Sequence, residues 1–482
     1  MRILLIQPPK APTVIGGEDL HIYEPLDLEY IAAGVGDGHE VRILDMRFDK
    51  GLEACLAKFE PEIVGLTAYT THVNVVKALC LRIKRARPSA LTVVGGHHAT
   101  AFPHDFEVEG VDVVVAGEGV FSFRELVDAF ERGPIGVRAL LEMGGAVGAR
   151  ILRSKHNLRP LDSYPFPRRD LTREHRKEYF SEWMKPMATI VTSKGCPFRC
   201  EFCCLWKLTD GRYLERAPEE IVRELETVEE KNVFFADAES MINVARMTRL
   251  AELIKERGID KKYFCYSRSD SVLRHPELYR KWREIGLERV FVGFEFFRDD
   301  DLGDVHKRTT VEENEAAMRV LNELDISIIA SYLVRPEFTK ADFRAFVEYC
   351  RRLKREMKFS MFLFSVMTPL PGSNFYEASK DRLMTHNYDH FDLFHAVLPT
   401  TLPLKEFFEE VHGLYQAVNG PQEMIPTLRR FKMLEIPKIM QRYYRVAVQM
   451  RNAYKDYEAV SAVSEVPGVP SDQVCPAGEV RS

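Results

Sequence analysis

The sequence lacks the features that would place the chain in a membrane or on a nucleic acid. Its 482 residues contain no apolar run of the roughly 18 residues that a membrane-spanning helix needs. The first apolar run, Ile3–Ile6, is too short for the core of a signal peptide and better fits a buried strand. The 67 basic residues are outnumbered by 72 acidic ones, a net charge of −5, so no overall basic field would attract nucleic acid.

Cysteine and glycine patterns argue against further classes. The nine cysteines are not paired at the spacings of extracellular disulfide frameworks, so we expect a cytoplasmic protein in a reducing compartment. Neither G-x-G-x-x-G after the first strand nor G-x4-G-K-[ST] is present. Their absence argues against the common dinucleotide and nucleoside triphosphate sites.

Short apolar runs alternate with amphipathic segments such as Val75–Lys84 over residues 1–135. This alternation predicts an α/β domain with a parallel, doubly wound, Rossmann-like sheet, which binds ligands beyond the carboxyl ends of its strands. The expected strands are Ile3–Ile6, Val41–Leu44, Ile63–Leu66, Leu91–Val94 and Val111–Val115. Their carboxyl ends carry Pro8–Pro9, Asp45–Arg47, Thr67–Thr70, Gly95–His98 and Gly117–Gly119. Glycines there would let the backbone approach a large flat ligand.

Three cysteines form the most specific motif of the sequence. Cys196, Cys200 and Cys203 have the spacing C-x3-C-x2-C, directly after the apolar run Met187–Thr192. A [4Fe–4S] cluster is normally held by four thiolates, so three suggest a cluster with one iron open to a substrate or cofactor. Structural zinc is the alternative, although zinc sites usually add a second cysteine pair or histidines. Unligated thiols are the third possibility. Cys204 directly follows the third cysteine, a spacing that does not suit a cluster ligand, and is expected to be a buried small apolar residue.

The motif, with Phe202 directly before the third cysteine, resembles the cluster loop of radical S-adenosylmethionine (SAM) enzymes. In that family the open iron chelates SAM, and one-electron reduction yields a 5′-deoxyadenosyl radical that removes hydrogen from unactivated carbon. The resemblance implies a [4Fe–4S] cluster on Cys196, Cys200 and Cys203. It also implies an external one-electron donor of the flavodoxin or ferredoxin type.

Residues 1–135 resemble the cobalamin-binding domain that often precedes radical SAM domains. The matching stretches are Pro8–Pro9, Glu24–Leu28, Val94–His97 and Gly117–Gly119. The resemblance implies cobalamin contacts at Pro9, Arg47, Thr67, Gly95, Gly96, His97, Glu118 and Gly119. The alternative is a Rossmann-like domain that has lost its ligand.

One position departs from that family. Many cobalamin domains have D-x-H-x-x-G, in which the histidine binds cobalt, whereas this register begins Asp45-Met46-Arg47. A guanidinium stays protonated and cannot coordinate a metal. We therefore predict cobalamin without a protein histidine on cobalt, with His97 and His98 as the nearest alternatives.

The remaining chain divides into four parts. Residues 136–183, marked by proline and glycine, predict a linker. Six strand–helix repeats over residues 184–380 predict the partial (β/α)6 barrel of radical SAM enzymes. Residues 381–460 are expected to be mainly helical, and residues 461–482 lack periodicity, which predicts a disordered tail.

Catalytic groups of barrel folds lie at strand carboxyl ends. By resemblance, SAM contacts are expected at Phe202, Asp237, Glu239, Arg268, Glu295 and Pro371. Gly293–Glu295 matches the family's G-x-E-S segment, but Phe296 replaces the serine, which puts one SAM contact in doubt. Each acidic residue could equally be a helix cap. No side chain is assigned a catalytic role.

The predicted helix 434–457 alternates aromatic, methionine and basic residues. Such a helix could lie at a membrane surface, in peripheral contact at the inner face, and meet a membrane-resident substrate. Core packing with a solvated basic face is the interpretation that we favour.

Two segments, Glu24–Leu28 and Phe391–Thr400, resemble those of hopanoid C-3 methylases, which methylate pentacyclic lipids. The resemblance implies a cobalamin-dependent radical SAM methyltransferase acting on an unactivated carbon of an apolar substrate, most similar to a hopanoid. No side-chain acid or base could ionise such a C–H bond. A cobalamin-dependent cyclase or oxidoreductase, a methylase of another natural product, and a metal-stabilised binding or sensor module remain alternatives.

Overall fold

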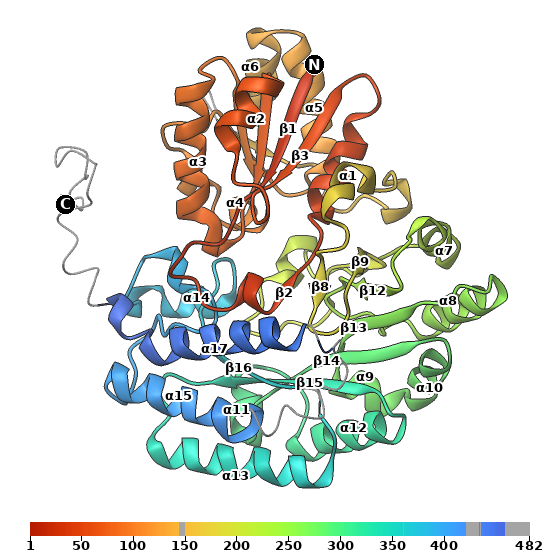
Figure 1. The fold of residues 1–482 in the computed structure, drawn as a ribbon, viewed down its shortest axis with the longest axis vertical. Coiled ribbons are helices and arrows are strands. Elements are labelled where there is room, and N and C mark those ends of the chain that lie inside the picture. The colour runs from red at the N-terminus through yellow and green to blue at the C-terminus, as the bar shows by residue number, and fades with distance from the viewer. Residues whose placement is uncertain (144–149, 360, 421–432, 434, 458–482) are drawn as a thin grey trace.

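Two parallel sheets, each of six strands, dominate the structure (Figure 1). The computed structural model describes residues 1–143, 150–359, 361–420, 433 and 435–457. The N-terminal sheet has the order β3-β1-β4-β5-β6-β7. Its strands are β1 (Arg2–Gln7), β3 (Glu40–Asp45), β4 (Ile63–Thr67), β5 (Leu91–Gly95), β6 (Val113–Ala116) and β7 (Ile151–Arg153). The predicted doubly wound fold is confirmed, because helices cover both faces of this sheet.

Helices α2 (Leu52–Phe59), α3 (Val73–Ala86) and α4 (His97–Ala101) pack on one face of the sheet. Helices α1 (Leu26–Val35), α5 (Val120–Glu131) and α6 (Pro134–Glu142) pack on the other. The last strand, β7, pairs with β6 although it lies within residues 136–183, where we expected only a linker. Three residues are too few to show a strand pattern in the sequence.

The second sheet has the order β16-β15-β14-β13-β12-β9, which confirms the six predicted repeats. Its strands are β9 (Met187–Ile190), β12 (Asn232–Phe235), β13 (Lys262–Arg268), β14 (Leu287–Glu295), β15 (Ser327–Val334) and β16 (Met361–Val366). The helices of this half are α7 (Pro218–Thr227), α8 (Val244–Glu256), α9 (Ser269–Arg274), α10 (Pro276–Glu284), α11 (Asp299–Asp304), α12 (Val311–Glu323), α13 (Lys340–Glu356) and α14 (Asn374–Ser379).

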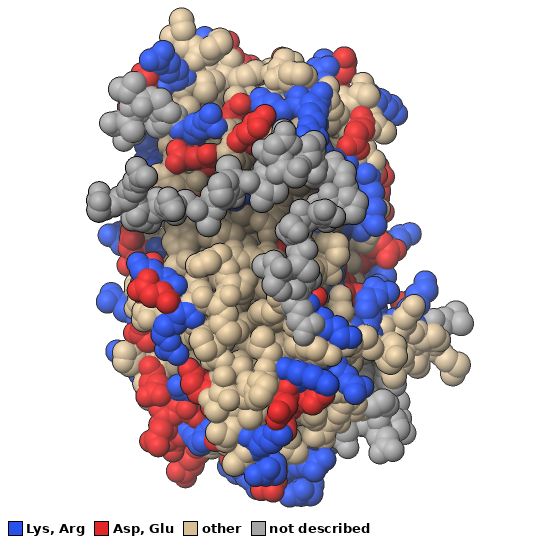
Figure 2. Space-filling model, turned by 90° about the vertical axis from the view of Figure 1, so that its left-hand side faces the viewer, with Lys and Arg blue, Asp and Glu red and all other residues tan. Residues whose placement is uncertain are grey.

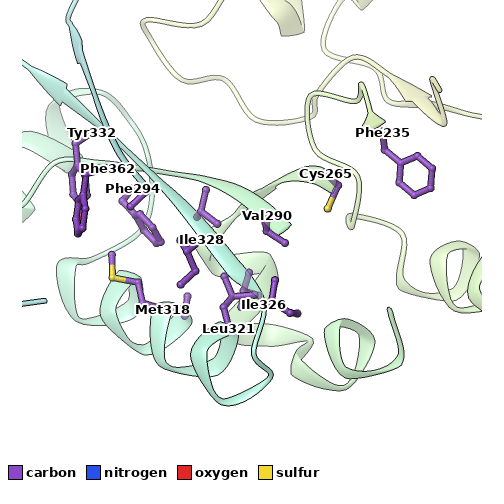
Figure 3. Close-up of a cluster of buried hydrophobic side chains, with 14 of the residues drawn as sticks. Phe235, Cys265, Val290, Phe294, Met318, Leu321, Ile326, Ile328, Tyr332 and Phe362 are labelled. Atoms are coloured by element: carbon purple, nitrogen blue, oxygen red, sulfur yellow. The ribbon is translucent and has the colours of Figure 1, made fainter. Parts of the chain in front are cut away.

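Alternate residues of these strands face opposite sides of the sheet. On the outer side, Val290, Phe294 and Ile328 point toward the helix that carries Met318 and Leu321 (Figure 3). That helix, α12, begins with a reciprocal cap in which Thr310 Oγ1 accepts the N–H of Glu313, at 3.1 Å, and the Glu313 carboxylate accepts the N–H of Thr310, at 2.8 Å. The inner face carries a separate apolar cluster that includes Phe234, Phe264, Phe291 and Met361.

Two C-terminal helices pack beside the second sheet (Figure 1). Helix α15 (Leu404–Asn419) contacts α13, and α17 (Ile436–Asn452) contacts α15. Val446 and Met450 of α17 are buried, whereas Tyr444 is 72% exposed. The helix therefore packs one face on the core and leaves an aromatic side chain in solvent. The predicted tail, 461–482, and Leu434 lie outside the described residues.

In the part of the chain that the structure describes, no helix could span a membrane. Figure 2 shows one face on which charged side chains gather toward the ends and edges, with a broad uncharged area between them.

Candidate active site

A cavity of about 710 Å³ lies where the carboxyl ends of the two sheets face each other. Its N-terminal wall includes Thr67, Gly95, Gly96, His97, Glu118 and Gly119, from the loops after β4, β5 and β6. Its opposite wall includes Thr189, Ser193, Lys194, Gly195, Ala236 and Asp237, from the loops after β9 and β12. The sequence predicted ligand-binding loops in each half of the chain separately, and in the structure both sets of loops border the same cavity.

The loop after β5 needs a glycine at position 96. Gly96 has φ +102°, and a Cβ there would lie 2.7 Å from the backbone nitrogen of Ala68. A side chain would therefore force the loop away from β4. The close approach leaves Gly95 and Gly96 as an unobstructed part of the cavity wall.

Six of the eight predicted cobalamin residues line the cavity, while Pro9 and Arg47 do not. Pro9 is half-buried just beyond β1. Arg47 forms two bonds to Asp45, Nε to Oδ1 at 2.8 Å and a terminal nitrogen to Oδ2 at 2.6 Å. Burial lowers the pKa of Arg47, but the bonded carboxylate outweighs burial and raises it. The guanidinium is therefore held as one half of an ion pair.

The two neighbouring histidines differ in their surroundings. Both ring nitrogens of His98 are occupied, Nδ1 by Thr70 Oγ1 at 3.2 Å and Nε2 by Asp105 Oδ2 at 3.0 Å. His97 lines the cavity, with its ring centroid 5.4 Å from that of Tyr69. Burial lowers the pKa of His97, which favours the neutral imidazole. His98 is thus a structural residue, and His97 is the histidine that faces the cavity.

Two polar groups of the N-terminal wall are held by internal bonds. Thr67 Oγ1 donates to Asp27 Oδ2 at 2.7 Å, so α1 fixes the end of β4. The Glu118 carboxylate accepts the N–H groups of Val120, at 2.6 Å, and Phe121, at 3.1 Å. Glu118, which we predicted as a cobalamin contact, therefore caps the first turn of α5.

The cysteine loop begins with a tight turn that requires a glycine. Gly195 has φ +86°, and a Cβ there would lie 2.2 Å from the carbonyl oxygen of Arg212. Cys200 is buried, and Cys196 and Cys203 are half-buried. Burial raises the pKa of Cys196, and raises that of Cys203 to about 12. These thiols are therefore protonated unless a metal cluster displaces their protons.

The donor set fits an iron–sulfur cluster. A terminal nitrogen of Arg268 lies 3.8 Å from Cys200 Sγ, and its guanidinium stacks 3.8 Å from the Phe198 ring centroid. A buried cation beside the thiolates would offset the negative charge of a thiolate-bound cluster. Within the described ranges, no three His, Cys, Asp or Glu side chains surround a single metal position. A cubane does not need such a group, because its thiolates bind separate iron atoms.

The predicted acidic residues near SAM make internal bonds. Asp237 accepts the N–H groups of Thr192, at 2.8 Å, and Ser193, at 2.9 Å, and it also accepts the hydroxyl of Thr192. Burial raises the pKa of Asp237. Because these bonds fix the backbone just before the cysteine loop, Asp237 positions that loop.

Glu239 lies between two strand ends. It accepts the N–H of Met241 at 3.1 Å and of Arg268 at 2.5 Å. Burial raises the pKa of Glu239 to about 7. The carboxylate thereby joins the loop after β12 to the end of β13, where Arg268 reaches Cys200.

The other predicted SAM residues surround the cysteine loop. Glu295, at φ +66°, pairs with Lys307 Nζ at 2.6 Å. Phe202 packs with Phe296, the residue that replaces the expected serine. Pro371 precedes Gly372, at which a Cβ would lie 3.2 Å from Ala101 Cβ and 3.8 Å from Cys204 Cβ. That turn therefore lies between the cysteine loop and α4.

Sequence reasoning missed several residues of the cavity wall. Asp27, Lys194, Tyr23 and Tyr266 all line it. Asp27 lies within the segment Glu24–Leu28, and Lys194 lies two residues before Cys196, so polar side chains next to these motifs were the available signal. Tyr23 and Tyr266 carried no signal, because their place depends on the packing of β13 against the segment before α1.

Aromatic side chains form the cavity floor on the barrel side. Tyr23, Phe234 and Tyr266 line the cavity and belong to the inner-face cluster. The Tyr23 and Phe234 rings stack at 4.9 Å, and those of Phe234 and Phe264 at 4.8 Å. An apolar molecule could bury its surface against this floor.

Comparison with known proteins agrees with this two-part arrangement. The family model described as "B12 binding domain" matches residues 12–127, and that of the "Radical SAM superfamily" matches residues 190–350. A hopanoid C-3 methylase of Methylococcus capsulatus is 30% identical over 400 residues, 80% of this chain and 75% of that protein. An anaerobic magnesium-protoporphyrin IX monomethyl ester cyclase of Cereibacter sphaeroides is 27% identical over 442 residues, 86% and 70% of the two chains.

A solved structure shares the whole arrangement of domains. It is that of OxsB, a cobalamin-dependent SAM radical enzyme, with aqua-cobalamin and SAM bound. Its TM-score is 0.65 at 13% sequence identity, covering 96% of this chain and 74% of that one. At this identity the likeness concerns the fold alone.

Proposed function

Because the chain belongs to the cobalamin-dependent radical SAM methyltransferase family, and so uses a [4Fe–4S] cluster, SAM and cobalamin, we propose that it methylates an unactivated carbon of an apolar substrate. A hopanoid lipid, methylated at C-3, is the substrate that we propose. The cofactors supply the radical and the methyl group when they are bound, and the protein supplies position and water exclusion.

The residues divide these tasks between the two walls of the cavity. We propose that Cys196, Cys200 and Cys203 hold the cluster, and that the loops containing Thr67, Gly95, Gly96 and Gly119 hold the corrin. Asp237 and Glu239 then act as positioning residues, because their bonds fix the start of the cysteine loop and the end of β13.

The aromatic floor of the cavity is the observation that best supports an apolar substrate. A radical acting on an unactivated carbon needs the substrate held close, with water excluded. On this part of the wall, the stacked rings of Tyr23 and Phe234 offer dispersion and apolar burial, whereas charged residues such as Asp27 line other parts of the cavity. This surface suits a fused-ring hydrocarbon better than a charged metabolite.

The test is mass spectrometry of lipids from a hopanoid-producing host that expresses the chain and is fed methyl-labelled methionine. We expect a hopanoid that carries one extra, labelled methyl group, and that disappears with the Cys200→Ala variant. A product that is cyclised or oxidised without the label would contradict methyl transfer and favour the cyclase alternative.

We also propose an external one-electron donor of the flavodoxin or ferredoxin type. Arg199 of the cysteine loop is exposed, and its guanidinium lies 5.7 Å from the Trp206 ring centroid. The Lys207 ammonium lies 5.4 Å from the same centroid. Such cations suit a donor with an acidic surface. Arg199→Glu should raise the KM for reduced flavodoxin and leave dithionite-driven SAM cleavage unchanged. Equal loss with both reductants would contradict this docking site.

A further inference from the structure

We propose that Lys194 binds an anionic oxygen of a cofactor in the cavity, either the SAM carboxylate or the phosphodiester of the cobalamin nucleotide. This inference rests on the cofactors of the family and not on the identity of the methylated substrate. Lys194 is assigned no role by the cysteine motif or by the predicted cobalamin contacts.

The position of Lys194 is fixed by its backbone. Lys194 ends β10 (Ser193–Lys194), which pairs antiparallel with β11 (Leu214–Glu215) in the register Lys194↔Leu214. The N–H of Ser193 donates to Asp237, and the tight turn at Gly195 packs closely against the backbone of Arg212. The side chain between these two anchors lines the cavity, two residues before Cys196.

The Lys194 ammonium has no partner in the described part of the protein. No carboxylate lies within 4 Å of Nζ, and no side-chain hydrogen bond is formed among those residues. Two other lysines with low exposure are paired in the structure, Lys10 with Asp19 and Lys307 with Glu295, each at 2.6 Å. Lys194 is half-buried on the cavity wall, so a cofactor that fills the cavity would remove water from its ammonium. A ligand that supplies an acceptor in place of that water would therefore be bound more tightly.

The acid that interacts with Lys194 across the cavity is already engaged. Glu118 interacts with it electrostatically, but the Glu118 carboxylate accepts two N–H groups at the start of α5. An ammonium can only donate, so its partner must be an acceptor. SAM and cobalamin each carry one anionic oxygen group, and bonds to charged acceptors are the stronger ones.

The experiment measures cofactor binding under anaerobic conditions, without any turnover. Lys194→Met and Lys194→Gln remove the charge, Lys194→Arg keeps it, and Lys77→Met is the control, because Lys77 of α3 is also half-buried and does not line the cavity. The dissociation constants of four ligands are measured: cobalamin, cobinamide (which lacks the nucleotide phosphate), SAM, and decarboxylated SAM. Iron and sulfide content is measured for every variant, so that loss of the cluster is seen directly.

We expect both neutral variants to weaken one anionic ligand about tenfold or more, while its analogue without the anion is unchanged and Lys194→Arg recovers most of the affinity. Weakened cobalamin with unchanged cobinamide identifies the phosphodiester. Weakened SAM with unchanged decarboxylated SAM identifies the carboxylate. The proposal is overturned if neither anionic ligand changes more than about twofold, or if each analogue weakens equally. Failure to methylate any lipid would refute the proposed substrate and leave these constants unaffected.

Discussion

At the scale of single residues, the thiols of the cysteine loop are the groups on which the chemistry depends. Cys200 is 7% exposed and lies beside Arg268 and the ring of Phe198. A cluster that loses one of three ligands, in a site with no spare thiolate at the right offset, should not assemble stably.

Cys200→Ala should therefore abolish both the iron–sulfur absorbance and 5′-deoxyadenosine formation after anaerobic reconstitution. The matched control is Cys204→Ala, which removes the adjacent half-buried thiol and should retain both signals. Retained 5′-deoxyadenosine formation in Cys200→Ala would contradict the cluster assignment.

The cobalt ligand gives a second residue-scale prediction. Arg47 is paired with Asp45, His98 is bonded at both nitrogens, and only His97 of these three lines the cavity. We expect Co(II) cobinamide bound to the protein to show no nitrogen splitting in its electron paramagnetic resonance spectrum. Cobinamide is used because it has no nucleotide base of its own. A nitrogen triplet that disappears in His97→Ala would show that a protein histidine binds cobalt.

The sequence predicted which residue types belong to the site better than it predicted the orientation of their side chains. The cysteine spacing and the glycines at strand ends are local patterns, and Gly95, Gly96 and Gly119 do line the cavity. Arg47 was expected at a ligand, yet a bond to a residue two positions away turns it to Asp45. Lys194 was overlooked, because nothing in a sequence states that a lysine will lack an acidic neighbour in space.

At the scale of elements, a buried charge network joins the N-terminal domain to the barrel. Arg176 pairs with Glu24, and with Glu230 at 2.5 Å, and lies 3.8 Å from Glu29. Burial and the neighbouring Glu24 raise the pKa of Glu29 well above its usual range. Removing the arginine would leave the buried carboxylates of Glu24 and Glu230 with less compensating positive charge, although Arg169 also lies 3.4 Å from Glu24.

Arg176→Met should lower the free energy of unfolding by about 3–5 kcal/mol, measured by urea denaturation. Arg168→Met is the control, because Arg168 pairs with Asp170 at 2.8 Å on the surface and should change stability by about 0–1 kcal/mol. If the two variants lost equal free energies of unfolding, the buried network would not stabilise the protein more than the surface ion pair does.

A second element-scale contact joins the segment after α14 to Asp456, which lies beyond the end of α17 at Asn452. His395 Nδ1 contacts Asp392 at 2.9 Å, and Nε2 contacts Asp456 at 3.0 Å. Burial lowers the pKa of His395, but the two carboxylates outweigh burial and raise it from 6.5 to about 9. His390, stacked at 4.6 Å, has its pKa lowered to about 4, chiefly by burial.

Because the folded-state pKa of His395 is raised, its contribution to stability is complete below about pH 6.5 and is lost as the pH rises through about 9. Between these pH values the wild-type protein should lose up to about 3 kcal/mol relative to His395→Gln, in urea denaturation at each pH. Identical pH slopes in the two proteins would contradict a charged His395.

Strand prediction succeeded where apolar runs were long enough to be buried on both faces, as in β1, β4 and β15. It failed for β7, whose three residues form a strand because the edge of β6 is available to pair. The same limit applies to the pairing of β2 (His21–Ile22) with β8 (Phe180–Ser181), because contact between residues 158 to 160 positions apart is not visible in a two-residue pattern.

At the scale of the whole molecule, the account depends on two domains that place their strand carboxyl ends around one cavity. Neither sheet alone encloses it, because its walls combine the loops after β4, β5 and β6 with those after β9 and β12. Sequence could predict each half from its own pattern. It could not predict the facing of the two halves, which depends on contacts such as Arg176 with Glu24.

The most direct test of this arrangement is electron paramagnetic resonance of the reconstituted protein carrying Co(II) cobalamin, recorded with the cluster oxidised and with it reduced. If corrin and cluster occupy opposite walls of one cavity, the reduced cluster should broaden the Co(II) signal and shorten its relaxation time, and Cys200→Ala should remove the effect. A Co(II) spectrum and relaxation time that are the same in both cluster states would contradict the account.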